Sequence, residues 1–127
     1  MLSHIAILME NQPGALSRVV GLFSQRGYNI DSLSVAPTQD PTLSRLTMTT
    51  SENPEIVNQI LRQLYKLVDV VMVQNLSDAE AYSIELAIIK LVSSREKIEK
   101  IISQAKELEG KILDDKDGHI MFEIWGD

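Results

Sequence analysis

The first part of the chain has hydrophobic positions whose spacing switches from the period of a strand to that of a helix. Residues 2–9 form a short, largely apolar run with Ile5, Ile7 and Met9 on one face, which is typical of a strand. Residues 14–26 carry apolar side chains three and four positions apart, which predicts an amphipathic helix with Pro13 at its start. Gly27 follows, where a left-handed residue commonly ends a helix. The pattern predicts a strand followed by a helix.

The same switching continues to residue 75. Apolar side chains alternate before and after a turn-rich segment at residues 36–42, which predicts two strands of a hairpin. Asn53 and Pro54 are typical of an N-cap and a first helical position, and a second helical stripe follows, ending at Val68. Residues 67–74 are rich in valine and favour a strand. The order βαββαβ predicts an α+β, ferredoxin-like layer of helices on an antiparallel sheet.

A polar linker at residues 77–81 separates this first unit, residues 1–76, from a second unit at residues 82–127. Ser93 and Glu96 have the spacing of a capping box, which predicts the start of a third helix. The other predicted elements are a strand at residues 82–92, a helix end at Gly110, and strands at residues 111–113 and 120–125 around a turn at residues 114–118. The second unit is therefore a partial ferredoxin-like βαββ, without a closing helix and strand.

Composition narrows the possible partners. Hydrophobic residues make up 44% of the 127 residues, which is enough for a core. Asp and Glu number 18 against 12 Lys and Arg, so the formal net charge is −6. Because Lys and Arg clusters bind phosphate backbones and anionic membrane surfaces, we expect neither nucleic acid nor a membrane as a partner. Small ligands and other proteins remain open.

Several kinds of site are disfavoured by the residue types present. The chain has no cysteine, which excludes disulfides and thiolate metal sites. No apolar run reaches the ~18 residues of a membrane span, and the apolar start lacks the basic region of a signal peptide, so we expect a cytoplasmic protein. His4 and His119 have no spaced partners, and the acidic turn at residues 114–118 lacks the bidentate glutamate of a calcium loop. We predict no metal site.

Residues 10–18 contain the groups of the chain that are most suited to binding a small ligand. A strand that ends at Met9 and a helix that begins near Gly14 place unpaired helix amides at one point, where they attract a carboxylate. Gly14 lets a ligand approach the backbone. The side-chain amides of Asn11 and Asn29 each offer a hydrogen-bond donor and a hydrogen-bond acceptor. From spacing alone, such a segment is more often an ordinary turn, in which Asn11 is only an N-cap and Asn29 only a turn residue.

Residues 9–30, with the sequence MENQPGALSRVVGLFSQRGYNI, resemble the opening of acetohydroxyacid (acetolactate) synthase small subunits. Residues 32–38 (SLSVAPT), 40–47 (DPTLSRLT) and 63–70 (QLYKLVDV) continue this resemblance. It is dense through residue 75 and weaker beyond. Because these motifs are long and contiguous, the chain is identified as resembling this family of regulatory subunits.

The resemblance implies an N-terminal ACT domain that pairs with a second copy through its second strand and first helix. Valine or a related amino acid binds at that seam in the family and restrains a large catalytic subunit, which the small subunit otherwise activates. Thiamine diphosphate, Mg²⁺ and usually FAD belong to the large subunit, so no cofactor is expected in this chain. The implied effector-binding residues are Asn11, Gly14, Ala15 and Leu16 from one chain, and Asn29 and Ile30 from the other.

Other functions fit the pattern less well. A stand-alone ACT amino-acid sensor that regulates another enzyme is the main alternative. An acylphosphatase-like catalyst needs a phosphate-cradling glycine-rich loop with an arginine, and residues 10–18 do not form such a glycine-rich loop. An RNA-binding module needs strand aromatics and a basic face, and neither is visible. Arg18, Arg26 and Arg45 are candidates for contact with a large subunit or for a solvated face. We predict a non-catalytic regulatory chain.

Overall fold

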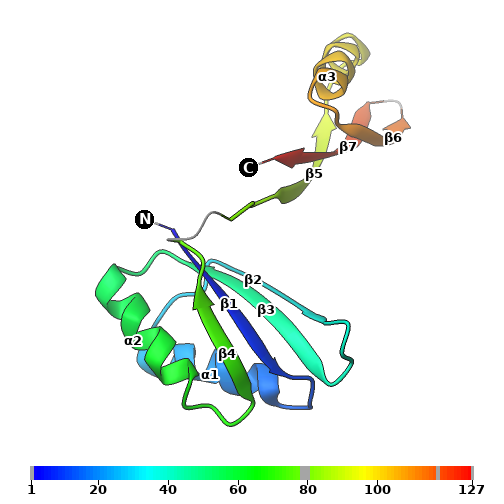
Figure 1. Ribbon diagram of the computed structural model, residues 1–127. Helices are drawn as coiled ribbons and strands as arrows, with labels where there is room; N and C mark the ends of the chain where they lie inside the picture. The colour runs from blue at the N-terminus through cyan, green and yellow to red at the C-terminus, as the bar shows by residue number, and fades with distance from the viewer. Residues whose placement is uncertain (1, 78–80, 117, 127) are drawn as a thin grey trace. The chain divides into compact units, whose positions relative to one another are not determined.

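The computed structural model describes residues 2–77, 81–116 and 118–126, which form two compact units at residues 1–81 and 82–127 (Figure 1). The predicted turn at residues 114–118 and linker at residues 77–81 therefore fall partly outside the described residues. The elements of the first unit are β1 (Ser3–Glu10), α1 (Ala15–Arg26), β2 (Ser32–Pro37), β3 (Leu43–Thr50), α2 (Pro54–Leu64) and β4 (Val70–Asn75).

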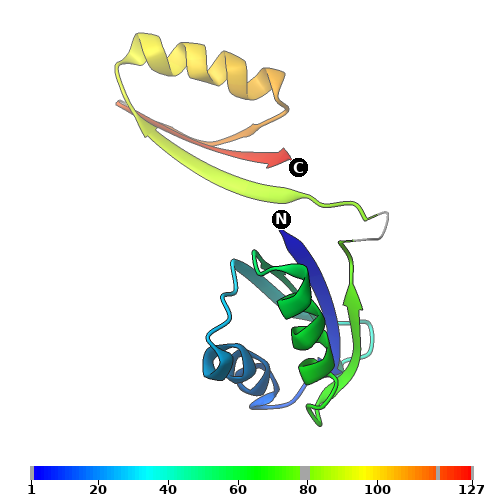
Figure 2. The ribbon, with the colours of Figure 1, turned by 90° about the vertical axis from the view of Figure 1, so that its left-hand side faces the viewer.

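The first unit is a four-stranded antiparallel sheet in the order β2-β3-β1-β4. Both helices lie on one face of it (Figures 1 and 2). Alternation explains this: Ile5, Ile7 and Met9 are buried toward the helices, together with Leu46 and Met48 of β3. The predicted βαββαβ ferredoxin-like fold is confirmed.

The helix ends show which local predictions hold. Gly27 has φ 69°, as expected for a left-handed helix end, and Asn53 caps α2 by accepting a 2.9 Å hydrogen bond from the Ile56 amide. Pro13, in contrast, lies before α1, whose N-cap is Gly14 in a left-handed conformation. The second helical stripe also ends earlier than predicted, because α2 stops at Leu64 and Val68 is 86% exposed.

Strand β2 lies at one edge of the sheet, and all six of its residues are exposed. Leu33 and Val35 pair with Met48 and Leu46, so they point to the helix-bearing face, yet each remains more than a third exposed. One backbone edge of β2 therefore has no neighbouring strand among the residues that the structure describes. An open edge with apolar side chains favours pairing with another strand.

The second unit has the predicted order βαββ, in a sheet ordered β5-β7-β6. Its elements are β5 (Glu85–Val92), α3 (Arg95–Glu107), β6 (Lys111–Lys116) and β7 (His119–Gly126). Among the described residues, Ile98, Ala105, Ile120 and Phe122 form its buried core. These strands and this helix correspond in order to β1, α1, β2 and β3 of the first unit.

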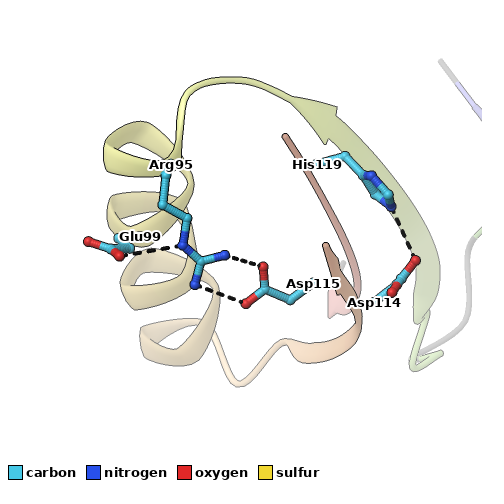
Figure 3. Close-up of polar contacts among 5 residues, drawn as sticks. All are labelled: Arg95, Glu99, Asp114, Asp115 and His119. Carbon is cyan, nitrogen blue, oxygen red and sulfur yellow. Dashed lines mark hydrogen bonds and ion pairs between the residues drawn. The ribbon is translucent and has the colours of Figure 1, made fainter. Parts of the chain in front are cut away.

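Two predictions for the second unit need correction. Strand β6 runs through Asp114 and Asp115 to Lys116, because polar partners hold these acidic residues in the strand (Figure 3). Asp115 accepts a 2.7 Å hydrogen bond from Arg95 at the start of α3, and Asp114 lies 3.1 Å from His119 of β7. The capping box does not form: the N-cap of α3 is Ser94, without a side-chain hydrogen bond.

In the parts of the chain that the structure describes, no helix has both the length and the hydropathy needed to cross a membrane.

Candidate functional site

The loop between β1 and α1 is fastened to the β2–β3 hairpin by Asn11. Its backbone amide donates to the Thr42 carbonyl at 2.7 Å, and its side-chain Nδ2 donates to the Pro41 carbonyl at 2.9 Å. Asn11 is therefore not the N-cap of α1. Because Nδ2 is occupied, the side-chain oxygen of Asn11 is left to accept a hydrogen bond from elsewhere.

The start of α1 has no side-chain cap. Gly14 occupies the N-cap with φ 85°, and no side chain accepts from the amides that follow. The Ala15 amide donates to the Gln12 carbonyl at 3.2 Å, and the first helical bond runs from the Arg18 amide to the Gly14 carbonyl at 3.0 Å. The Leu16 and Ser17 amides precede that bond, so they have no acceptor within the helix. This helix end favours an anion.

A cavity of about 220 Å³ lies beside this helix start. Asn11, Ala15 and Leu16, three of the residues expected at an effector site, line it. Its wall mixes apolar side chains with a few polar groups, as small-molecule sites do. The remaining lining residues are Met9, Glu10 and Gln12 of the β1 end and loop, and Val35, Ala36, Pro37 and Ser44 of the β2–β3 hairpin.

Gly14 lies next to this cavity but contacts Arg18. A Cβ at position 14 would lie 2.8 Å from Arg18 Nη1, and the positive φ strains any other residue. Arg18 in turn forms an ion pair with Asp69 through two hydrogen bonds, one of them 3.0 Å from Nη2 to Oδ1. The Asp69 carbonyl also accepts from the Glu10 amide at 2.8 Å. Asp69 therefore holds both ends of the loop.

The Arg18–Asp69 pair was not foreseen from the sequence. The two residues are 51 positions apart, and the only available signal was one acidic residue inside the valine-rich run. Hydrogen bonding by the Arg18 guanidinium lowers the pKa of Asp69 below its usual range, and the same bond raises the pKa of Arg18. Asp69 is only 4% exposed, and burial alone would raise its pKa, but the hydrogen bonds from Arg18 outweigh this effect.

Asn29 and Ile30 do not line the cavity of their own chain. Asn29 lies exposed beyond the far end of α1, where its Nδ2 donates to Asp31 at 2.8 Å and its carbonyl accepts from Thr50 at 2.7 Å. Ile30 is half-buried against the core. The six expected site residues thus form two separate groups on one chain.

Over the described residues, no group of three or more His, Cys, Asp or Glu side chains is arranged to hold a metal ion. The polar groups around the cavity instead offer hydrogen bonds and an anion-binding helix end. Such a set of groups suits the binding of a small anion or zwitterion.

Comparisons with known proteins identify the family of the chain. Residues 5–72 match the family described as AHAS small subunit-like ACT domain. The chain is also 46% identical over 110 residues to the acetolactate synthase isozyme 3 small subunit of Salmonella typhimurium, covering 87% of this chain and 68% of that protein. The chain belongs to the acetolactate synthase small subunits. The small subunit of Haemophilus influenzae is 49% identical over 113 residues, with the same coverage.

A solved structure agrees with this family assignment. The acetolactate synthase small subunit from Thermotoga maritima superposes with a TM-score of 0.87 at 32% identity, covering 99% of this chain and 79% of that one. The ACT domain of a Chlorobium tepidum GTP pyrophosphokinase gives a TM-score of 0.52 at 22% identity, which shows a shared fold only. The chain is a small regulatory subunit of acetolactate synthase, a holoenzyme of branched-chain amino acid biosynthesis, and associates with its large catalytic subunit.

Proposed function

We propose that this small subunit binds valine or a related branched-chain amino acid at a seam between two copies of its first unit. The bound effector restrains the large subunit, and the empty small subunit activates it. Uncapped helix amides beside a part-apolar cavity are the observation that carries this proposal. The cofactors thiamine diphosphate, Mg²⁺ and FAD are assigned to the large subunit, following the family resemblance.

Each part of a free amino acid has a matching group in this arrangement. The carboxylate is placed at the Leu16 and Ser17 amides, where the helix dipole stabilises negative charge. The ammonium is placed at the Asn11 side-chain oxygen, which is left open because Nδ2 donates to Pro41. The branched side chain then packs against Leu16 and Val35, which line the cavity.

The size of the cavity supports a contribution from a second copy. Its 220 Å³ is below the roughly 300–1,000 Å³ of ordinary ligand pockets. Strand β2, which borders it, has the unpaired edge described above. Pairing two β2 edges antiparallel brings the far end of one β2 toward the near end of the other. This supports placing Asn29 and Ile30 of one copy near Asn11 of its partner.

Regulation then follows from a shift between two arrangements of the dimer. An effector that touches both copies favours the arrangement in which the seam is closed. It changes catalysis only to the extent that it binds the two arrangements with different affinity. Feedback inhibition by a branched-chain amino acid is thus a property of the pair rather than of one chain.

Calorimetric titration of valine into the chain tests the site. Asn11→Ala removes the proposed ammonium acceptor, and because a hydrogen bond to a charged group contributes about 1.5–3 kcal/mol, affinity should fall about 10- to 100-fold. Asn29→Ala should also weaken binding. Asn58→Ala, an exposed asparagine of α2, is the matched control and should bind like the wild type.

A second measurement addresses regulation. Adding the chain to its purified large subunit should raise acetolactate formation, and valine should reverse that increase. Binding of neither valine, leucine nor isoleucine by the wild type would refute the effector site. Unchanged acetolactate formation on mixing would refute the activating role.

A further inference from the structure

The cations of the first unit are gathered on one side of it. Residues 1–77 contain five Lys and Arg residues. Four of them line two adjoining cavities, of about 540 and 670 Å³, that share Arg26, Gln63 and Lys66. Because α1 and α2 supply most of the lining, we call this surface the basic groove, defined by Arg18, Arg26, Arg62 and Lys66.

No carboxylate lines either cavity of the basic groove. Arg18 pairs with Asp69, but Arg26, Arg62 and Lys66 have no ion-pair partner among the described residues. Arg26 donates instead to the neutral Gln63 side chain at 3.1 Å. A cluster of basic side chains without neighbouring carboxylates is unusual in a chain with six more acidic than basic residues.

The local energetics make this clustering costly in the isolated chain. Arg62 of α2 and Lys66, which lies just beyond the end of that helix, line the same cavity, where their like charges repel each other. The helix dipole favours one cation at the end of α1 and one at the end of α2, but it does not explain the absence of counter-charges around them. An anionic occupant would relieve this repulsion.

We propose that the basic groove docks an acidic segment of the large catalytic subunit. The proposal rests on the regulatory role proposed above. The cations are spread along two adjoining cavities rather than aimed at one point, which suits several carboxylates on a chain better than one phosphate group. Gln25 and Gln59 add hydrogen-bonding groups, and Leu22 and Leu67 add apolar surface, as protein contacts require.

The groove also reaches the effector loop. Gly14 and Arg18 line the groove, and the same Arg18 is paired with Asp69, whose carbonyl accepts from the Glu10 amide. A ligand that reorders the loop therefore acts on one wall of the docking surface. This contact gives the effector a direct physical route to the large subunit.

Charge reversal tests the docking surface. Arg62→Glu combined with Lys66→Glu should weaken binding of the large subunit at least 10-fold at low salt and should reduce the salt dependence of that binding. Arg45→Glu is the matched control. Arg45 is the fifth cation of the unit, and its position between Leu8 and Ala36, out of phase with buried Leu46, places it on the helix-free face. It should bind within threefold of the wild type.

Three results would overturn this assignment. The double variant could bind the large subunit as tightly as the wild type, or Arg45→Glu could weaken binding equally. Micromolar binding of inorganic pyrophosphate that the double variant abolishes would identify a small-anion site instead. Valine titration of the same variants separates the two proposals. The double variant should still bind valine. If the wild type did not bind valine, that result would contradict the effector site but not the docking surface.

Discussion

Asp69 shows how one side chain can position a loop. It is nearly buried, its carboxylate is held by Arg18, and its carbonyl is bonded to the Glu10 amide. Residues 51 positions apart are thereby joined beside the helix start. The sequence predicts the positions of Asn11 in the loop and Leu16 in the first turn of α1, because turns and helical stripes are local patterns. It does not predict this pair, because nothing local to either residue specifies the other.

The Arg18–Asp69 pair should make stability depend on pH. The folded pKa of Asp69 lies below the value of about 3.9 for an unfolded aspartate, so the pair stabilises the fold above that value. This contribution is lost as pH falls through the folded pKa. Urea unfolding of wild type and Asp69→Asn should therefore differ at pH 6, and the difference should shrink toward pH 3. A difference that is constant over this range would contradict the assignment.

Gly14 should resist substitution. Gly14→Ala places a Cβ against Arg18 and imposes a left-handed conformation, so we expect a loss of about 1–2 kcal/mol in unfolding free energy. Gly21→Ala is the matched control, because its Cβ would have no neighbour within 4 Å and it lies inside α1. It should gain about 0.5–1 kcal/mol. If chemical denaturation showed that both substitutions change the unfolding free energy in the same direction, this explanation would be contradicted.

At the scale of elements, predictions succeeded where a pattern alone determines the structure. Alternation identified β1, and Asn53-Pro54 identified the start of α2. The strand β6 was predicted, but its end was placed too early, because acidic residues are typical of turns, whereas Asp114 and Asp115 are held in the strand by His119 and Arg95. Tertiary partners of this kind are not visible in the local sequence.

The caps of α2 and α3 should respond differently to truncation. Asn53→Ala removes a side-chain acceptor from the Ile56 amide and should lower the unfolding free energy by about 1 kcal/mol. Ser94→Ala removes no side-chain hydrogen bond and should stay within about 0.5 kcal/mol of the wild type. Thermal and urea denaturation check both. A loss at Ser94 as large as that at Asn53 would show that the cap bond is not the cause.

At the scale of the whole molecule, the two units differ in how much apolar surface they bury. The core of the first unit takes side chains from β1, β3, β4 and both helices. The described core of the second has Ile98, Ala105, Ile120 and Phe122, while Ile88 on β5 is 61% exposed. Since burial of apolar area is the main stabilising term, the units should differ in stability.

Hydrogen exchange of the full chain measures that difference. Amides of β1 and β3 should exchange more slowly than those of β5 and β7, by at least tenfold in the midstrand positions, because local opening costs less where less is buried. The exchange rates of both sheets are measured in one sample, so each sheet is the control for the other. Equal protection of β5 and β1 would show that the second unit is stabilised by contacts other than its own core.

Strand β2 has a consequence for cells that make more than one small subunit. Its open edge presents backbone groups, which every sequence shares, and only Leu33 and Val35 distinguish one edge from another on the helix side. If this edge is the pairing edge, backbone complementarity alone cannot separate isozymes. Mixed pairs of paralogous chains would then form by subunit exchange. Correct pairing would have to be determined by side chains at the edge, or by synthesis of the paralogues at different times.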